Sequence, residues 1–256
     1  MSRLDSTHDR PLEGAICVVT GASRGIGKGI AVELGKAGAT VYITGTTTQQ
    51  NRPPSLITSK FVTNAEVGGP ETIDDTAKLI NEQGGQAIPV YCDHSDDDQV
   101  KDLFDLIDQK HGRIDLLVNN AFRLPPGGSA TLVSNFWTKD GIDMWDAVHT
   151  VGLRSHYVAS CYAIPLMMKT VKERGISSNT SKMTNPLIVM ISSFGGTCYT
   201  FNVAYGVGKA GVDRLAKDMA LVLREKGIAV NSIYPGVVMT ERMINASKDP
   251  DWAKQV

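Results

Sequence analysis

The 256-residue chain has little net charge and no long hydrophobic run. Its 26 basic and 27 acidic residues nearly cancel and are well mixed along the chain. The sequence therefore has neither the basic stripe of a nucleic-acid-binding protein nor the polybasic segment that binds an anionic membrane surface. No apolar run approaches the roughly 18 residues that predict a membrane helix. We expect neither nucleic acid nor membrane among its partners.

Cysteine is scarce, and the first residues carry no apolar core. The spacing of the four cysteines is not that of metal ligands, and we expect buried, reduced thiols in a reducing compartment and no metal site. They are Cys17, Cys92, Cys161 and Cys198. Residues 1–13 lack the hydrophobic segment of a signal peptide and contain acidic residues, which transit peptides avoid. The sequence predicts a cytoplasmic protein with a flexible N-terminus over 1–13.

What the chain does contain is an alternation of short apolar runs and longer helical patterns. We predict strands at 15–20, 40–44, 86–92, 114–119, 187–191 and 228–234. We predict helices at about 25–37, 70–83, 96–111, 141–173 and 203–226. This alternation predicts one α/β domain over 1–256, a three-layer, Rossmann-type doubly wound parallel sheet. Pro89 inside a strand is tolerated at an edge or a bulge.

Two polar segments interrupt this alternation. Residues 46–69 are long for a connection between a strand and a helix, where about 2–6 residues are usual. They could form a lid or partner surface, or an insertion without a role, and both interpretations stay open because the segment leaves the ligand-facing end of the sheet. For residues 175–186 the sequence favours an insertion without a role.

The stretch "TGASRGIGKGI" follows the first predicted strand directly, at residues 20–30. Gly21, Gly25 and Gly27 would form a tight turn that a pyrophosphate can approach closely, since glycine has no Cβ atom. The next helix would offer free N–H groups and a positive dipole to the phosphates. No Gly-Lys-Ser/Thr follows, which excludes a P-loop. The pattern indicates a dinucleotide site, the alternative being a glycine-rich turn without a ligand.

The end of the second predicted strand favours NADP(H), with NAD(H) left open. The strand ends "ITGTTT" and has no acid to bind the ribose hydroxyls of NAD and repel a 2′-phosphate. Arg24 could pair with that phosphate, and Ser23, Thr46 and Thr47 could donate hydrogen bonds to it. The alternative for Arg24 is a solvated turn residue.

From these residues the chain resembles the short-chain dehydrogenase/reductase family. The resemblance rests on an ordered set of motifs that spans most of the chain: "TGASRGIG" at 20–27, "CDHSD" at 92–96, "LVNNA" at 117–121, "ISS" at 191–193, "YGVGK" at 205–209 and "YPGVVMT" at 234–240. The stretches "MWDAV", "VGLRSHY" and "FNVAYGVGK" are most similar to one branch of that family.

The resemblance implies a bound nicotinamide dinucleotide and a set of residues around it. The implied cofactor-binding residues are Gly21, Ser23, Arg24, Gly25, Ile26, Gly27, Thr46, Asp93, Asn119, Asn120, Ala121, Tyr205, Lys209, Pro235, Gly236 and Thr240. Asp93 would contact the adenine amino group, and Thr240 the nicotinamide carboxamide. The alternatives are a helix N-cap for Asp93 and structural bracing for Asn120.

Tyr205 and Lys209 lie four residues apart, which places them on one face of the predicted helix. A free phenol has a pKa of about 10, and a nearby ammonium together with the positive nicotinamide of oxidised cofactor would lower it. Tyr205 would then exchange a proton with a carbonyl oxygen, while Lys209 would also hold the nicotinamide ribose. The resemblance implies that Ser193 binds the same oxygen; Ser192 is the rival for this role.

Two residues depart from the family pattern. Many members have an asparagine in the proton relay where this chain has Gly152, and a glycine where it has Phe122. His149 or His156 could replace the asparagine, but a histidine on a helix is more often packed or exposed. Phe122 would narrow the pocket.

We therefore expect an oxidoreductase that transfers a hydride between NADP(H) and a carbonyl or secondary alcohol. The alternative is a catalytically weak dinucleotide-binding sensor or partner protein, which Gly152 keeps open. Enoyl reduction fits the Tyr-x-x-x-Lys spacing less well.

The substrate class cannot be read from the sequence. The loops at 122–142 and beyond 240 would shape the substrate pocket, with Phe136 and Trp137 as an apolar wall or as loop anchors.

Apolar residues on the last two long helices suggest a homo-oligomer, a dimer or a tetramer. Family members commonly continue to a seventh strand, whereas Val256 follows Pro235 closely, so we expect either that this chain is truncated or that its sheet lacks the seventh strand.

Overall fold

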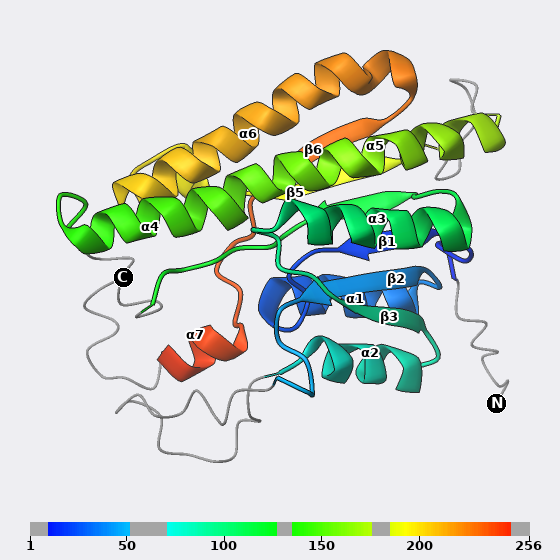
Figure 1. Cartoon of the computed structure of the whole chain (residues 1–256), viewed down its shortest axis with the longest axis horizontal. Helices are drawn as coiled ribbons and strands as arrows, with labels where there is room; N and C mark the ends of the chain where they lie inside the picture. Colours follow the sequence, from blue (N-terminus) through cyan, green and yellow to red (C-terminus); the bar gives the residue numbers. More distant parts are fainter. Residues whose placement is uncertain (1–9, 52–70, 127–134, 176–184, 247–256) are drawn as a thin grey trace, which may run out of the picture.

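A computed structural model describes residues 10–51, 71–126, 135–175 and 185–246 (Figure 1). Most of the two polar segments, at 52–69 and 176–184, and residues 1–9 of the N-terminus lie outside the described residues. The described part contains a parallel sheet of six strands in the order β3-β2-β1-β4-β5-β6. The strands are β1 (Ile16–Val19), β2 (Thr40–Gly45), β3 (Gln86–Tyr91), β4 (Leu116–Asn119), β5 (Leu187–Ile191) and β6 (Ala229–Ile233). This confirms the predicted Rossmann-type sheet, and Pro89 lies on its edge strand β3.

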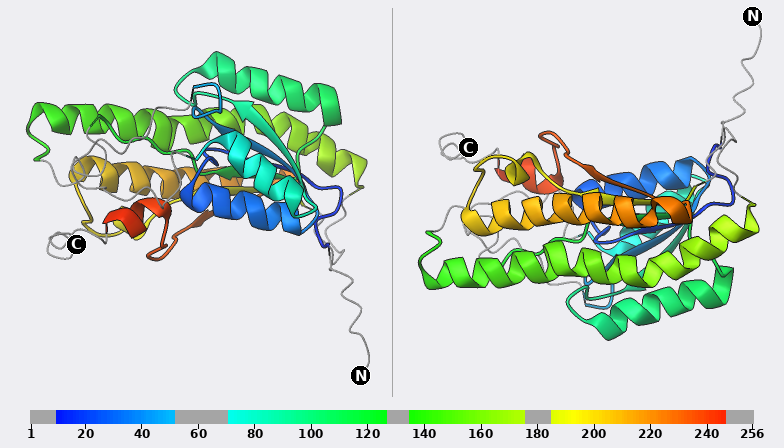
Figure 2. Two further views of the ribbon diagram at one scale, coloured as in Figure 1. Left: turned by 90° about the horizontal axis from the view of Figure 1, so that it is seen from below. Right: turned by 90° about the horizontal axis from the view of Figure 1, so that it is seen from above.

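Helices cover both faces of the sheet (Figure 2). They are α1 (Gly25–Lys36), α2 (Ile73–Glu82), α3 (Asp97–His111), α4 (Lys139–His149), α5 (Ser155–Glu173), α6 (Val203–Leu223) and α7 (Glu241–Ala246). Helices α1 and α2 pack on one face, and α3, α5 and α6 on the other. The prediction of one helix over 141–173 needs correction, because a π-helical turn at Thr150–Arg154 separates α4 from α5.

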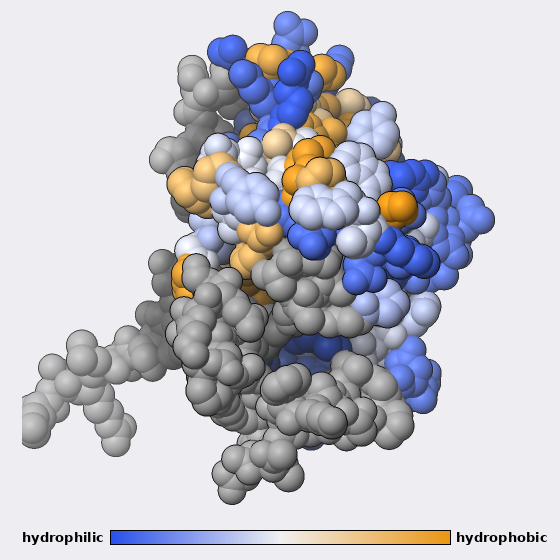
Figure 3. Space-filling view, turned by 90° about the vertical axis from the view of Figure 1, so that its left-hand side faces the viewer, coloured by the Kyte–Doolittle hydropathy of each residue, from blue (hydrophilic) through white to orange (hydrophobic). Residues whose placement is uncertain are grey.

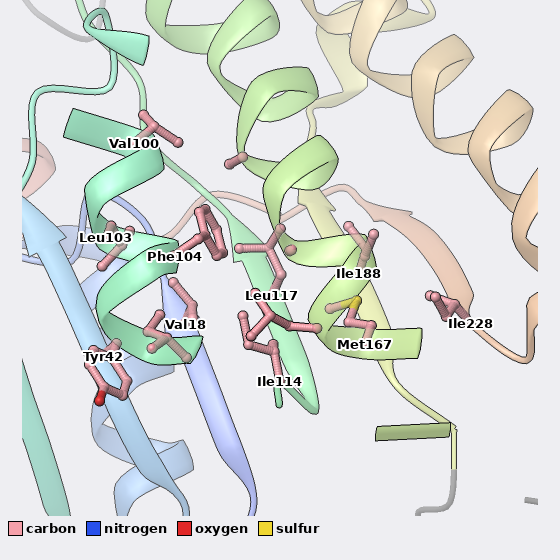
Figure 4. Packing of buried hydrophobic residues seen from close by; sticks show 14 of the residues in the cluster. Val18, Tyr42, Val100, Leu103, Phe104, Ile114, Leu117, Met167, Ile188 and Ile228 are labelled. Atoms are coloured by element: carbon pink, nitrogen blue, oxygen red, sulfur yellow. The ribbon is translucent and has the colours of Figure 1, made fainter. Parts of the chain in front are cut away.

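The larger core lies between the sheet and helices α3, α5 and α6. Figure 4 shows Phe104 of α3 and Met167 of α5 directed toward the strand residues Val18, Leu117 and Ile188. The side chains of Val18, Leu117 and Ile188 are fully buried. Burial on both faces explains why these strands are continuous apolar runs.

Side-chain caps fix the start of three helices near the carboxyl edge of the sheet. Thr72 caps α2, Asp96 caps α3 and Asn202 caps α6, each by accepting backbone N–H groups. The alternative interpretation of Asp93 as the N-cap of α3 is therefore wrong, because Asp96 takes that position. The Asn202 cap accepts the N–H of Tyr205 at 2.9 Å and so orients the first turn of α6.

The expectation of four buried thiols is wrong for two of them. All four cysteines are free, and Cys17 and Cys92 are buried in the core, whereas Cys161 and Cys198 are exposed. Cys161 lies on an exposed side of α5 and Cys198 in the loop before α6. No helix in the described ranges is long and apolar enough to cross a bilayer.

Candidate active site

The glycine turn between β1 and α1 has no room for side chains. Gly21 and Gly25 have φ angles of 65° and 59°, which favour glycine. A Cβ atom on Gly21 would lie 2.8 Å from the Cα of Ala121, and one on Gly27 would lie 2.5 Å from the carbonyl oxygen of Gly21. The turn is therefore closely packed against the segment that follows β4.

The residues after β4 brace this turn. The Asn120 amide donates to the carbonyl oxygens of Thr20 and Gly21, at 2.8 and 3.0 Å. The Thr20 hydroxyl oxygen accepts the N–H groups of Asn120 and Ala121, both at 2.9 Å. The side chain of Asn119 instead turns into the core and donates to Ser160 at 3.0 Å. In this structure, Asn120 and Ala121 contact the turn directly, as the bracing interpretation requires.

The first N–H group of α1 already binds an anionic oxygen. Gly25 N–H donates to the Glu241 carboxylate at 2.9 Å, and Lys28 lies 3.8 Å from the same side chain. Burial alone would raise the pKa of Glu241, but backbone N–H groups and Lys28 lower it below its usual value. The carboxylate stands in for a phosphate oxygen, since both are anionic acceptors. The turn therefore fits a pyrophosphate group.

Basic side chains gather where β2 ends. Arg24 Nη2 donates to the hydroxyl of Thr47 at 3.1 Å and to the carbonyl of Glu71 at 3.3 Å. Lys28 pairs with the carboxylate of Glu71 at 2.6 Å. Arg24 is therefore held against the segment after β2 and is not a freely solvated turn residue.

The other residues predicted to bind the adenosine half lie around this edge. Ser23 is buried and lies close to Gly45 of β2. The Thr46 carbonyl oxygen accepts from Asn51 at 2.8 Å. Ile26 is half-buried and packs against the core beneath α1, so its side chain is structural here.

Asp93 follows β3 and pairs with Arg123, with 2.7 Å between the carboxylate and the guanidinium. It also accepts the backbone N–H of Ser95 at 2.9 Å and the Ser95 hydroxyl at 2.6 Å. Burial would raise the pKa of Asp93, but the hydrogen bonds from Ser95 and Arg123 outweigh it and lower the pKa. The carboxylate is thus held at the carboxyl edge of the sheet.

The end of β5 and the start of α6 bring Ser193, Tyr205 and Lys209 together. The Ser193 side chain lies close enough to the Tyr205 phenol to lower its pKa, and its oxygen accepts the N–H of Gly195 at 3.1 Å. Ser192 points elsewhere: its buried hydroxyl donates to the backbone carbonyl of Lys209 at 3.2 Å. Ser193 is therefore the serine next to the phenol, while Ser192 satisfies a backbone group.

Lys209 lies almost fully buried, one helical turn after Tyr205. Its ammonium donates to the carbonyl oxygen of Ile191 at 2.9 Å and lies 5.9 Å from the centre of the Tyr205 ring. Burial lowers the pKa of Lys209 to about 8, against the opposing charge of Asp213. Burial raises the pKa of Tyr205, and the neighbouring Ser193 hydroxyl opposes the rise only in part. In the protein alone desolvation therefore dominates, and the lowering expected with oxidised cofactor stays a prediction.

Gly152 lies in the π-helical turn, where the Phe122 ring packs against it. A Cβ atom on Gly152 would be 3.0 Å from the nearest carbon of that ring. His156 is buried, with its Nε2 3.1 Å from the carbonyl oxygen of Ala121, and His149 Nδ1 is 2.8 Å from the carbonyl oxygen of Trp145. Within the described ranges neither imidazole hydrogen-bonds to Lys209, so both hold backbone groups.

The loop after β6 approaches the glycine turn. The Thr240 side chain lies beside Gly25, 3.5 Å from where a Cβ would stand. Pro235 is half-buried and Gly236 exposed in the segment that leads from β6 to Thr240. The structure thus brings Thr240 to the glycine turn.

An apolar pocket of about 350 Å³ lies beside the first turn of α6. Its lining residues are Phe136, Gly141, Ile142, Trp145, Val203 and Ala204. Figure 3 faces the end of the molecule where α4 and α6 begin and shows hydrophobic residues gathered in its upper half. Phe136 thus lines a pocket, whereas Trp137 is largely exposed and stacks edge-on against Phe136. Residues 127–134 and 247–256, parts of the predicted substrate loops, lie outside the described residues.

Comparison with known proteins gives a consistent assignment. The family model for short chain dehydrogenases matches residues 67–251. Dehydrogenase/reductase SDR family member 1 from Mus musculus is 42% identical over 232 residues, which cover 90% of this chain and 63% of that protein. This chain thus spans less than two thirds of that relative's length, and the match confirms the narrower resemblance to one branch.

Solved structures agree on the fold. The Pseudomonas aeruginosa RhlG/NADP active-site complex superposes with a TM-score of 0.73 at 24% identity, covering 96% of this chain and 82% of that one. A metagenomic short-chain oxidoreductase in complex with NADP gives a TM-score of 0.66 at 28% identity, covering 89% and 84%. With the glycine turn and the Ser193–Tyr205–Lys209 group in place, this chain belongs to the short-chain dehydrogenase family.

Proposed function

We propose that the chain is an NADP(H)-dependent oxidoreductase that interconverts a carbonyl compound and a secondary alcohol. The observation that carries the proposal is the Tyr205 phenol, which lies beside Ser193 and one helical turn from a buried Lys209. The anion-binding glycine turn supports a dinucleotide partner. The similar oxidoreductase solved with NADP, at 28% identity, supports the same cofactor.

The cofactor would be held along the carboxyl edge of the sheet. The N–H groups at the start of α1 would hold the pyrophosphate, and Arg24 with Thr46 and Thr47 would hold the 2′-phosphate. Asp93 would bind the adenine amino group, and Thr240 the carboxamide. When bound, the nicotinamide supplies the hydride that reaches the carbonyl carbon.

The chain's own residues supply the proton and the orientation. The Tyr205 hydroxyl gives its proton to the carbonyl oxygen as the hydride arrives, so that C=O becomes CH–OH. Ser193 donates a hydrogen bond to the same oxygen and stabilises the negative charge that develops on it. Lys209 holds its positive charge near the phenol and favours the phenolate that remains.

The proposed test measures oxidation of NADPH and of NADH with a panel of carbonyl compounds. We expect turnover with NADPH at a higher kcat/KM than with NADH. Cofactor binding without turnover on any carbonyl would favour the second candidate, a dinucleotide-binding sensor, for which Gly152 is the motivating residue. Equal or better turnover with NADH would contradict the NADP assignment.

Arg24 provides a sharper test of the 2′-phosphate site. We expect Arg24→Ala to weaken NADPH binding by roughly tenfold to a hundredfold, because hydrogen bonds to charged groups contribute about 1.5–3 kcal/mol. NADH binding should change little. Arg214→Ala, which alters an exposed arginine of α6 paired with Asp218, is the matched control. An equal loss for both cofactors would remove Arg24 from the 2′-phosphate site.

A further inference from the structure

The ring of Tyr205 is in contact with two other aromatic rings. Phe122, from the segment after β4, lies with its ring centre 5.9 Å away at 86°, and Phe201, just before α6, lies 5.2 Å away at 86°. Both contacts have the edge-to-face geometry that aromatic pairs favour. Two segments far apart in the chain thus restrict the orientation of the same phenol ring.

Phe122 also contacts the two residues that flank the phenol. The Lys209 ammonium lies 5.2 Å from the centre of the Phe122 ring, within the range of a cation–π contact. On the other side, Gly152 leaves the space that the ring occupies, since a Cβ there would come within 3.0 Å of it. The glycine at 152 and the phenylalanine at 122 are therefore one coupled feature of the site.

Phe201 is held in an unfavourable backbone conformation. Its φ of 66° makes it the one non-glycine residue with a positive φ among the described residues. A bulky residue in this region is strained, and such strain is found mainly at functional sites. Asn202 next to it caps α6 on the N–H of Tyr205, so the strained residue, the cap and the phenol form one continuous unit.

Both phenylalanine rings keep free surface next to the phenol. Phe122 is 36% exposed and Phe201 is 41% exposed, although each contacts Tyr205. A molecule whose carbonyl oxygen reaches the Tyr205 hydroxyl has these ring surfaces beside it. Contacts between aromatic rings are more favourable than contacts of equal area with aliphatic groups.

We propose that Phe122 and Phe201 form an aromatic clamp that positions the Tyr205 ring and selects carbonyl groups conjugated to a flat ring. The inference rests on the proposed carbonyl chemistry and names its substrate class. Phe122 and Phe201 act as positioning residues, and Gly152 is the space that admits the Phe122 half of the clamp.

The experiment compares acetophenone with cyclohexyl methyl ketone, two ketones that have the same number of carbon atoms, give secondary alcohols and differ in the planarity of the ring. The measured quantity is the ratio of their kcat/KM values with NADPH, in the parent and in variants. We expect Phe122→Leu and Phe201→Leu each to lower this ratio by roughly twofold to tenfold, the usual worth of an aromatic contact. Phe122→Tyr, which keeps the aromatic ring, should retain the kcat/KM ratio of the parent. Tyr157→Leu, which changes an exposed aromatic residue of α5 that does not line the apolar pocket, is the control.

Two further readouts separate positioning from a merely structural role. Phe122→Leu should shift the pH profile of kcat/KM, because Lys209 loses its contact with the ring, whereas Phe122→Tyr should not. Gly152→Ala should reduce the stability measured by urea unfolding while Phe122 is present, and much less in a Phe122→Ala background. Additive losses in the double variant would overturn the coupling between the two residues.

The outcomes distinguish a failure of the aromatic clamp from a failure of the proposed carbonyl reduction. Turnover of both ketones with an unchanged ratio and pH profile in Phe122→Leu and Phe201→Leu would overturn the clamp and leave the proposed reaction intact. No turnover of either ketone by the parent, with NADPH still bound, would contradict the carbonyl chemistry and the clamp together.

Discussion

Lys209 illustrates how much the site depends on a single buried charge. Its ammonium is taken out of water next to Tyr205 and donates a hydrogen bond to the backbone carbonyl of Ile191. A buried cation disfavours folding unless its interactions compensate for the lost hydration. Because the position suits chemistry more than stability, replacing the charge separates the two contributions.

We predict that Lys209→Met loses most activity yet is at least as stable as the parent at pH 7. The folded-state pKa of about 8 lies below the unfolded value of 10.5, so the buried charge destabilises the fold fully below pH 8. The difference between these two pKa values corresponds to a loss of about 3 kcal/mol in folding free energy. This loss is relieved as the pH rises from 8 to 10.5. The parent should therefore gain stability relative to the variant across that window, as measured by urea unfolding.

Lys217→Met is the matched control, since Lys217 is exposed on the same helix. Its stability difference from the parent should not vary between pH 8 and 10.5. If the stability difference between Lys209→Met and the parent is also the same at pH 8 and at pH 10.5, the Lys209 ammonium is not destabilised by burial.

At the residue scale, the sequence predicted those positions whose chemistry depends on local spacing. Tyr205 and Lys209 lie four apart on a helix, and Gly21 and Gly25 lie in a turn between a strand and a helix. The direction of the Tyr205 pKa could not be predicted from this spacing. It depends on burial by Phe122 and Phe201, one of which comes from more than 80 positions earlier in the chain.

At the scale of elements, α7 and α1 meet over the glycine turn. Glu241 begins α7 and accepts the first N–H of α1, although 216 positions separate it from Gly25 in the sequence. Its carboxylate occupies a position suited to a phosphate oxygen. Lys28 lies 3.8 Å from that carboxylate and is close enough to interact with a phosphate in the same place. Cofactor binding would then require this carboxylate to move away from Gly25.

We predict that Glu241→Gln binds NADPH more tightly than the parent. Removing a negative charge from the start of a helix that binds phosphate should gain about 1 kcal/mol, roughly fivefold in Kd. Fluorescence titration of NADPH measures the change. Glu225→Gln, an exposed glutamate beyond the end of α6, should leave Kd unchanged. Weaker binding by Glu241→Gln would show that the carboxylate assists the cofactor.

The elements that the sequence predicted are those with a buried periodic face. The central strands β1, β4 and β5 were readable because both faces of the sheet are covered there, which makes each of them a nearly continuous apolar run. The edge strands β3 and β6 are more exposed, and their apolar patterns are shorter. The π-helical turn at 150–154 was missed because the apolar pattern continues through it. Glu241 was missed because its contact with Gly25 depends on the tertiary fold; the acid directly after "YPGVVMT" is the one local signal.

At the scale of the whole molecule, the proposed cofactor site joins segments from most of the described chain. The glycine turn follows β1, Asp93 follows β3, Asn120 follows β4, Ser193 follows β5 and Thr240 follows β6. A ligand that contacts all of these segments binds the folded state alone and must stabilise it. Self-association and a cytoplasmic location stay predictions from the sequence.

We predict that NADPH raises the midpoint of thermal unfolding. A ligand at a hundred times its Kd stabilises the fold by about 2.7 kcal/mol, which for a chain of this size is about 5–10 °C. NADH at the same concentration should give a smaller shift. Differential scanning fluorimetry measures both, and the absence of any shift with either cofactor would contradict a dinucleotide site.

The central claim is that Tyr205 donates the proton in carbonyl reduction. The most direct measurement compares kcat for NADPH oxidation by the parent, by Tyr205→Phe and by Tyr162→Phe, whose ring stacks on Phe104 away from the site. We predict that Tyr205→Phe loses at least a hundredfold in kcat, the usual size of general acid catalysis. It should still bind NADPH, and Tyr162→Phe should match the parent. Equal kcat values for Tyr205→Phe and the parent would contradict the mechanism.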